Sequence, residues 1–188
     1  MPTPARTSLD AITAAGGDIL DTRGLPGLTM QAVAHAVGVK SPSLYKHVAD
    51  REGLVGLIAD AAATDLATHL AGEVGLEGLA RSLRAWATAH PERFRLVFSG
   101  QGSPEVAAAA GAPLLKAARD LVGPANKLSA ARLVTAWATG FISMELAGAF
   151  QLGGDVDEAF EYGIERLTAA LQADQRQPFT TRDTRARS

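Results

Sequence analysis

The sequence contains no cysteine, and only 5% of its 188 residues are aromatic. A chain without cysteine has no disulfide, no thiolate zinc site and no cysteine nucleophile. The segment Met1–Ser8 lacks the apolar core of a signal peptide. The most apolar stretch, Leu133–Met144, is shorter than the roughly 20 residues that cross a bilayer. We therefore expect a cytoplasmic protein with no membrane partner.

The sequence also lacks an excess of positive charge, because its net charge is −2 and its pI is about 6.1. A strongly basic domain is the usual signature of a nucleic-acid-binding protein. Locally the balance differs: residues 40–51 carry Lys40, Lys46, Arg51 and His47 against a single acid, Asp50. Any argument for DNA binding must rest on this local placement.

Apolar residues make up 47% of the chain and are dominated by alanine and leucine, which favour helices. No stretch shows the alternation of apolar and polar residues that is typical of strands. We expect an all-α fold in which a three-helix DNA-binding domain precedes a helical bundle. The expected parts are an arm (1–7), a helix-turn-helix domain (8–52), a ligand-binding and dimerisation domain (53–173) and a polar tail (174–188). The expected helices are Ser8–Arg23, one from Thr29, one from Ser41, Asp50–Leu70, Leu76–His90, one from Pro91, Pro104–Val122, Leu128–Leu152 and one beginning at Asp155.

The segment from Thr29 to Val48 predicts a helix-turn-helix. Thr29 is suited to begin a short helix, and Gly38 to end it with a sharp turn. Ser41 is expected to cap the second helix. Apolar side chains fall on one face of each helix, at Met30, Val33, Ala34 and Val37 in the first and at Leu44 and Val48 in the second. Two short helices joined by a glycine turn form the helix-turn-helix unit.

The stretch Leu28–Leu54, LTMQAVAHAVGVKSPSLYKHVADREGL, resembles the DNA-binding region of the TetR family of repressors. Further along, the run Trp137-Ala-Thr-Gly140-Phe resembles the C-terminal domain of one TetR branch, which usually has Trp-x-His-Gly. Thr139 stands in the place of that histidine, so the role of the histidine does not carry over. The resemblance implies a homodimeric repressor that binds a palindromic double-stranded DNA operator and responds to a small-molecule effector.

A recognition helix in the major groove needs donors and short polar groups on its exposed side. By resemblance, Lys40, Ser41, Pro42 and Ser43 would meet bases, and Thr29, Tyr45, His47 and Arg51 would meet the DNA backbone. Gln31 would do either, and Lys46 would reach a phosphate. The alternatives stay open: Tyr45 as a packing residue and His47 as an ordinary surface histidine. His35 is assigned no role.

Large apolar groups on several later helices predict either a solid core or a ligand cavity between helices. The candidate ligand-binding residues are Trp86, Phe94, Phe98, Trp137, Phe141 and Met144. The last two long helices predict a four-helix interface between two subunits, with packing within one chain as the alternative. The candidate dimer residues are Gly148, Leu152, Phe160, Ile164 and Leu167.

Signs of catalysis are weak. Ser43-Leu-Tyr-Lys46 matches the Ser-x-x-Lys of penicillin-binding enzymes, but the partner motifs of those enzymes are absent. The four histidines show no ligand spacing with carboxylates. We expect a protein that is not an enzyme and has no metal or cofactor. A purely structural helical interaction module remains a further alternative.

Overall fold

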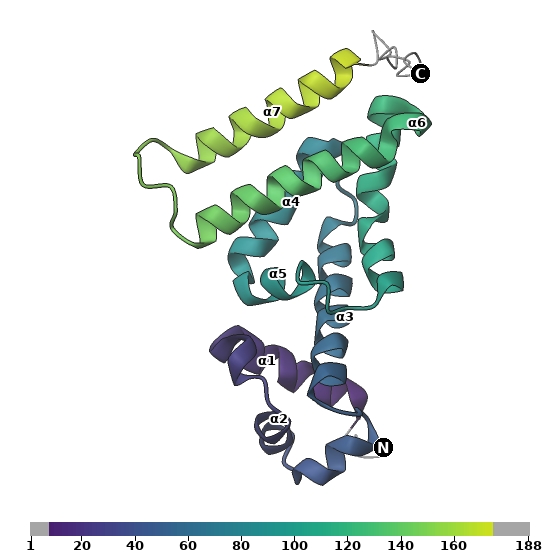
Figure 1. Ribbon diagram of the computed structural model, residues 1–188, viewed down its shortest axis with the longest axis vertical. Helices are drawn as coiled ribbons and strands as arrows, with labels where there is room; N and C mark the ends of the chain where they lie inside the picture. Colours follow the sequence, from purple (N-terminus) through teal and green to yellow (C-terminus); the bar gives the residue numbers. More distant parts are fainter. Residues whose placement is uncertain (1–7, 175–188) are drawn as a thin grey trace, which may run out of the picture. The chain divides into compact units, whose positions relative to one another are not determined.

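The computed structural model describes residues 8–174, which form helices and no strand (Figure 1). This confirms the expected all-α class. The expected arm (1–7) and all but the first residue of the expected tail (174–188) lie outside the described residues. The elements are α1 (Leu9–Gly27), α2 (Met30–Ala36), the 3₁₀ helix η1 (Ser41–Lys46), α3 (Arg51–Leu70), α4 (Gly75–Ala89), α5 (Pro91–Val97), α6 (Pro104–Leu146) and α7 (Val156–Asp174).

The chain divides into two compact units. Of the described residues, the first combines 8–72 with 82–112, and the second combines 73–81 with 113–174. Helices α1, α2, η1, α3 and α5 belong to the first unit, and α7 belongs to the second. The chain passes from one unit to the other within α4 and within α6.

The core of the first unit joins the helix-turn-helix to α3 and α5. Helix α1 packs against α2, α3 and α5, and Leu96 of α5 lies in the same buried cluster as Leu28 and Leu44. Leu9 is 42% exposed because it lies at the first residue of α1. The helix-turn-helix is thus fixed to α5 by a shared core.

Glycines in the left-handed region interrupt or end the long helices. Gly24 breaks the helical backbone of α1 at a φ of 65°, as its sequence predicts, and Gly123 divides α6 at a φ of 78°. The second part of α6 was expected to continue to Leu152, but it ends at Leu146. Gly148 there has a φ of 62°, and its N–H donates to Glu145 O at 2.9 Å. This glycine cap satisfies a terminal carbonyl and stops the helix six residues early.

The second unit holds α7 against α6 through aromatic rings. Trp137 and Phe141 of α6 pack on Phe160 of α7, with ring centroids 5.1 and 5.2 Å apart, respectively. Asp155 begins α7 as expected, because its Oδ1 accepts the N–H groups of Asp157 and Glu158. Arg81 of α4 pairs with Glu161 of α7 at 2.7 Å, and its hydrogen bond to Glu161 raises the pKa of Arg81.

Candidate nucleic-acid interface

Helix α2 is oriented by its capped start and its buried side. The Thr29 Oγ1 accepts the N–H of Ala32 at 3.1 Å, which confirms the predicted cap. Val33 and Ala34 are buried in the core of the first unit. Gln31 and His35 are therefore left on the exposed side of the helix, one turn apart.

The turn after α2 depends on Gly38, whose φ of 73° lies in the left-handed region. Its N–H donates to His35 O at 3.1 Å, and the N–H of Val39 donates to Ala34 O at 2.9 Å. These two hydrogen bonds form the glycine-dependent end of a helix that was predicted from the sequence. They fix the direction in which the chain enters η1.

Apolar residues anchor η1, the expected recognition helix, in the core of the first unit. Leu44 is fully buried and Val48 is nearly so, as their spacing predicts. The expected cap is wrong by one residue: Lys40 occupies the capping position, and its carbonyl oxygen accepts the N–H of Ser43 at 2.9 Å. The tighter winding of a 3₁₀ helix places Ser41 inside the first turn, so its hydroxyl does not cap.

Most of the ten predicted DNA-binding residues reach the surface. Tyr45 is 55% exposed, which argues against a mere packing role. Ser41 and Ser43 are partly buried. The exposed members are Thr29, Gln31, Lys40, Pro42, Tyr45, Lys46, His47 and Arg51.

A hollow of about 590 Å³ brings residues of α2 and η1 together. Of the predicted set it is lined by Thr29, Gln31, Lys40 and Ser41. His35, to which the sequence assigned nothing, lines the same hollow. The four-residue spacing between Gln31 and His35 was the available signal, because such a pair shares one face of a helix.

Arg51 has a structural role that the sequence did not predict. Its Nε donates to Leu28 O at 2.8 Å, and its Nη2 donates to Leu25 O at 2.9 Å. Leu25 lies in the last turn of α1, after the break at Gly24, and Leu28 lies in the connection between α1 and α2. The predicted phosphate contact of Arg51 stays a prediction, and the guanidinium has the further role of positioning the start of α2.

The local electrostatics favour an anion. Lys40, Lys46 and His47 are exposed around η1. The single nearby acid of residues 40–51, Asp50, accepts the N–H of Gly53 at 2.8 Å as the cap of α3. Part of its negative charge is therefore compensated at a helix start.

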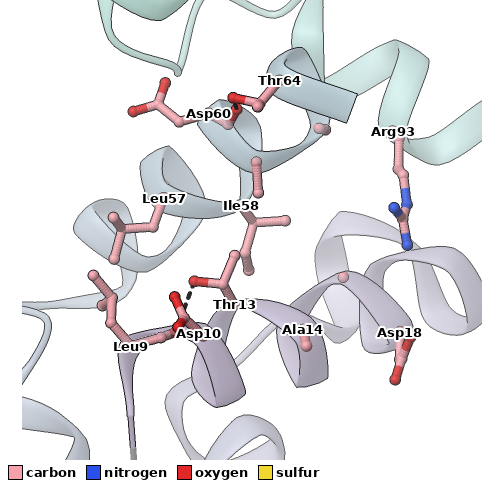
Figure 2. A pocket seen from close by; sticks show the side chains of 13 residues that line it. Leu9, Asp10, Thr13, Ala14, Asp18, Leu57, Ile58, Asp60, Thr64 and Arg93 are labelled. Carbon is pink, nitrogen blue, oxygen red and sulfur yellow. Dashed lines mark hydrogen bonds between the residues drawn. The ribbon is translucent and has the colours of Figure 1, made fainter. Parts of the chain in front are cut away.

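A second hollow, of about 550 Å³, lies between α1, α3 and Arg93 of α5 (Figure 2). The threonine hydroxyls that line this hollow, and one of the lining carboxylates, form hydrogen bonds within the protein. Thr64 donates to Asp60 O at 2.8 Å, and Asp60 Oδ1 accepts the N–H of Ser103 at 2.7 Å. In Figure 2 the side chains of Asp18 and Asp60 point away from each other, so we assign no ligand to this groove.

The six predicted ligand-binding residues fall into both units. In the first, Trp86 is buried with its Nε1 donating to Asp65 Oδ2 at 2.8 Å, and Phe94 packs on Phe98 at 5.1 Å between centroids. In the second, Trp137 and Phe141 pack on each other at 5.7 Å, while Met144 is 47% exposed. Trp86 and Phe94 therefore serve as core residues of their unit.

The predicted dimer residues need correction. Phe160 and Ile164 are fully buried within the second unit, so they offer no surface to another subunit. Gly148 ends α6, Leu167 is partly buried, and Leu152 is fully exposed in the connection to α7. Exposed apolar surface lies instead at Leu133, Met144 and Tyr162.

Other kinds of site find no support. No group of three or more potential metal-ligating side chains lies together in residues 8–174. Within the same residues, no helix is long and apolar enough to cross a membrane. Ser43 and Lys46 lie within η1, on the candidate interface itself.

An all-helical chain whose exposed polar groups surround a helix-turn-helix has the architecture of a DNA-binding transcriptional regulator. Residues 76–167 match the family model described as the Tetracyclin repressor-like C-terminal domain. The HTH-type transcriptional regulator Rv0681 of Mycobacterium tuberculosis is 29% identical over 185 residues, which cover 90% of this chain and 84% of that protein.

Solved structures agree with this class. The regulatory protein SCO4313 is 28% identical, with a TM-score of 0.73 over 88% of this chain and 98% of its own. A TetR protein of Acinetobacter baumannii AYE, solved in complex with minocycline, shares the fold at 19% identity, with a TM-score of 0.70 over 89% and 98% of the two chains. These similarities support a TetR-family transcriptional regulator.

Proposed function

We propose that this DNA-binding regulator is a ligand-responsive repressor that acts as a homodimer on a palindromic operator. The observation that carries the proposal is the surface around η1. Buried Leu44 and Val48 fix the segment from one side, and Tyr45, Lys46 and His47 are exposed. A short, anchored segment with exposed donors suits insertion into the major groove.

The division of contacts follows from side-chain length and charge. Lys46 is long and cationic, and Tyr45 and His47 carry donors, so these three residues contact phosphates. Ser41 and Ser43 are short and partly buried at the start of η1, so they approach base edges only when the segment lies deep in the groove. Arg51 supports the surface by holding the connection before α2.

The dimer forms through the exposed side of α6 and α7 in the second unit. Leu133, Gly140 and Met144 follow each other at spacings of seven and four residues, which places them on one exposed stripe of α6. Tyr162 is exposed on α7. A two-fold pairing of such helices buries both stripes in a four-helix arrangement.

The effector is an apolar or aromatic small molecule that binds in the second unit beside Trp137 and Phe141. These two rings join Phe150 and Phe160 in one aromatic cluster. Thr139, in the place of the usual histidine, donates its hydroxyl to Thr135 O at 2.7 Å. The proposal draws on the family and on the minocycline complex of the A. baumannii protein.

DNA binding is tested by selecting operators from a random duplex library and measuring their affinity for variants by fluorescence anisotropy. Tyr45→Ala and Lys46→Ala should each weaken binding about 5- to 100-fold, since one lost charged or hydrogen-bonded contact costs roughly 1–3 kcal/mol. Lys127→Ala removes an equal charge from an exposed site in the second unit. It should leave affinity unchanged. Unchanged affinity in both η1 variants would reject this surface as the DNA interface.

Repression and effector response require separate measurements. In vitro transcription from a promoter that overlaps the selected operator should fall when the protein is added. A library of apolar aromatic compounds should contain members that quench tryptophan fluorescence and lower operator affinity, and Trp137→Phe should weaken that response. Stimulated transcription would overturn the repressor assignment. Saturable binding that never changes operator affinity would overturn the sensor assignment.

A further inference from the structure

The hollow between α2 and η1 is lined by both polar and apolar side chains. Its polar lining residues are Thr29, Gln31 and His35 from the start and body of α2, and Lys40 and Ser41 from the start of η1. Ala32 and Val39, both partly buried, and the buried Ala34 lie among its lining residues. A ligand in this hollow therefore touches both helices of the helix-turn-helix at once.

The apolar part of the lining favours a base edge over a phosphate. A phosphodiester carries a full charge, and its desolvation against alanine and valine side chains costs free energy. The major-groove edge of an A·T pair combines hydrogen-bonding atoms with the apolar C5-methyl group of thymine. Such an edge matches a hollow whose lining combines polar side chains with alanine and valine.

The position of His35 is fixed by the backbone around it. Its carbonyl oxygen accepts the N–H of Gly38, the residue that turns the chain toward η1. Its side chain is exposed one turn after Gln31. An imidazole offers a donor and an acceptor, as does the amide of Gln31, so this pair is able to read the donor and acceptor atoms of adenine.

We propose that His35 is a specificity-determining residue that, together with Gln31, recognises one A·T pair in each operator half-site, with the thymine methyl group seated toward Ala32 and Val39. This inference rests on the proposed DNA-binding function. Beyond that function, it names the base pair that is recognised, and it gives a role to His35, which lies in α2 and not in η1.

The test compares wild-type protein, His35→Ala, His35→Gln and His69→Ala on operators substituted at every position. His69 is an exposed histidine of α3 and serves as the matched control. His35→Ala should lose about 5- to 100-fold of the discrimination between A·T and G·C at one symmetric position, the range that one base contact gives. His35→Gln should restore part of it, and His69→Ala should keep the full profile.

Substitution of deoxyuridine for thymidine tests the proposed contact of the thymine methyl group with Ala32 and Val39. Replacing thymine by uracil at that same position should weaken wild-type binding severalfold. An unchanged specificity profile in His35→Ala overturns the proposal. Uniform weakening on all operators, with a salt dependence of log K reduced by about 0.9, also overturns it, because that pattern marks a phosphate contact. If the wild-type protein selects no operator at all, the proposed function itself has failed.

Discussion

The indole ring of Trp137 lies directly over the Cα of Gly163, where a methyl group on Gly163 would overlap Trp137 Cζ2. The contact joins α6 to α7 at the aromatic cluster of the second unit. The absence of a side chain at Gly163 lets α7 approach α6 closely, and the indole of Trp137 occupies the space.

Gly163→Ala should destabilise the protein by about 1–3 kcal/mol, because an added methyl group overpacks a filled site. The matched control is Gly111→Ala, since Gly111 is a helical residue of α6 outside the proposed dimer stripe and a methyl group there meets nothing within 4 Å. That change should stabilise the protein by roughly 0.5–1 kcal/mol. Urea denaturation followed by tryptophan fluorescence measures both free energies of unfolding. Equal effects of the two substitutions would contradict the tight contact.

Arg51→Ala should lower both stability and DNA affinity, because it removes the hydrogen bonds to the carbonyls of Leu25 and Leu28. We expect a loss of about 1–2 kcal/mol in the free energy of unfolding, as for two partly exposed charge-assisted bonds. Lys46→Ala should reduce DNA affinity alone. Thermal denaturation and operator anisotropy separate the two effects, and a stable Arg51→Ala variant would refute the positioning role.

The ion pair between Arg93 and Asp21 should stabilise the contact between α5 and α1. Arg93 Nη2 lies 2.6 Å from Asp21 Oδ2, with side chains 25% and 31% exposed, and the hydrogen bond to Asp21 raises the pKa of Arg93. A double-mutant cycle with Arg93→Ala and Asp21→Ala should give a coupling of about 1 kcal/mol. Lys116 and Asp120, a pair within α6 that is 79% and 59% exposed, should give at most about 0.5 kcal/mol. If the coupling free energy of Arg93 and Asp21 is no larger than that of Lys116 and Asp120, the ion pair does not stabilise the contact between α5 and α1.

Glutamate substitutions should separate folding from dimerisation. Ile164→Glu should unfold the second unit, because it buries a carboxylate at a fully buried position. Leu133→Glu should leave the fold intact and shift the protein to monomer, since Leu133 is 47% exposed on the proposed interface. Lys127→Glu introduces the same side chain on another side of α6 as a control. Sedimentation velocity and circular dichroism are the measurements, and a folded, dimeric Leu133→Glu protein would place the interface elsewhere.

Local signals in the sequence predicted local structure well. Thr29 and Gly38 act within four residues of their positions, so their roles follow from short-range hydrogen bonds. The choice between Lys40 and Ser41 as the cap depended on 3₁₀ rather than α winding, which tertiary packing decides.

Contacts between residues far apart in the chain could not be predicted from the sequence. Arg51 bonds to carbonyls 23 and 26 residues earlier, and no local pattern reports such a partner. Periodicity correctly placed Phe160 and Ile164 on the apolar stripe of α7, but it does not distinguish a core within one chain from an interface between two. The DNA-binding, ligand-binding and dimer assignments themselves remain predictions until the experiments above are done.

The short length of η1 limits how much sequence one subunit can read. Six residues at about 2 Å each extend roughly 12 Å, which corresponds to about three or four base steps of 3.4 Å. Two copies would then specify about seven base pairs, a word that recurs by chance roughly once in 16,000 positions, whereas a genome offers a million or more competing sites. An operator of this regulator must therefore carry information outside the reach of η1, in bases met by α2 or in the deformability of the duplex between the half-sites.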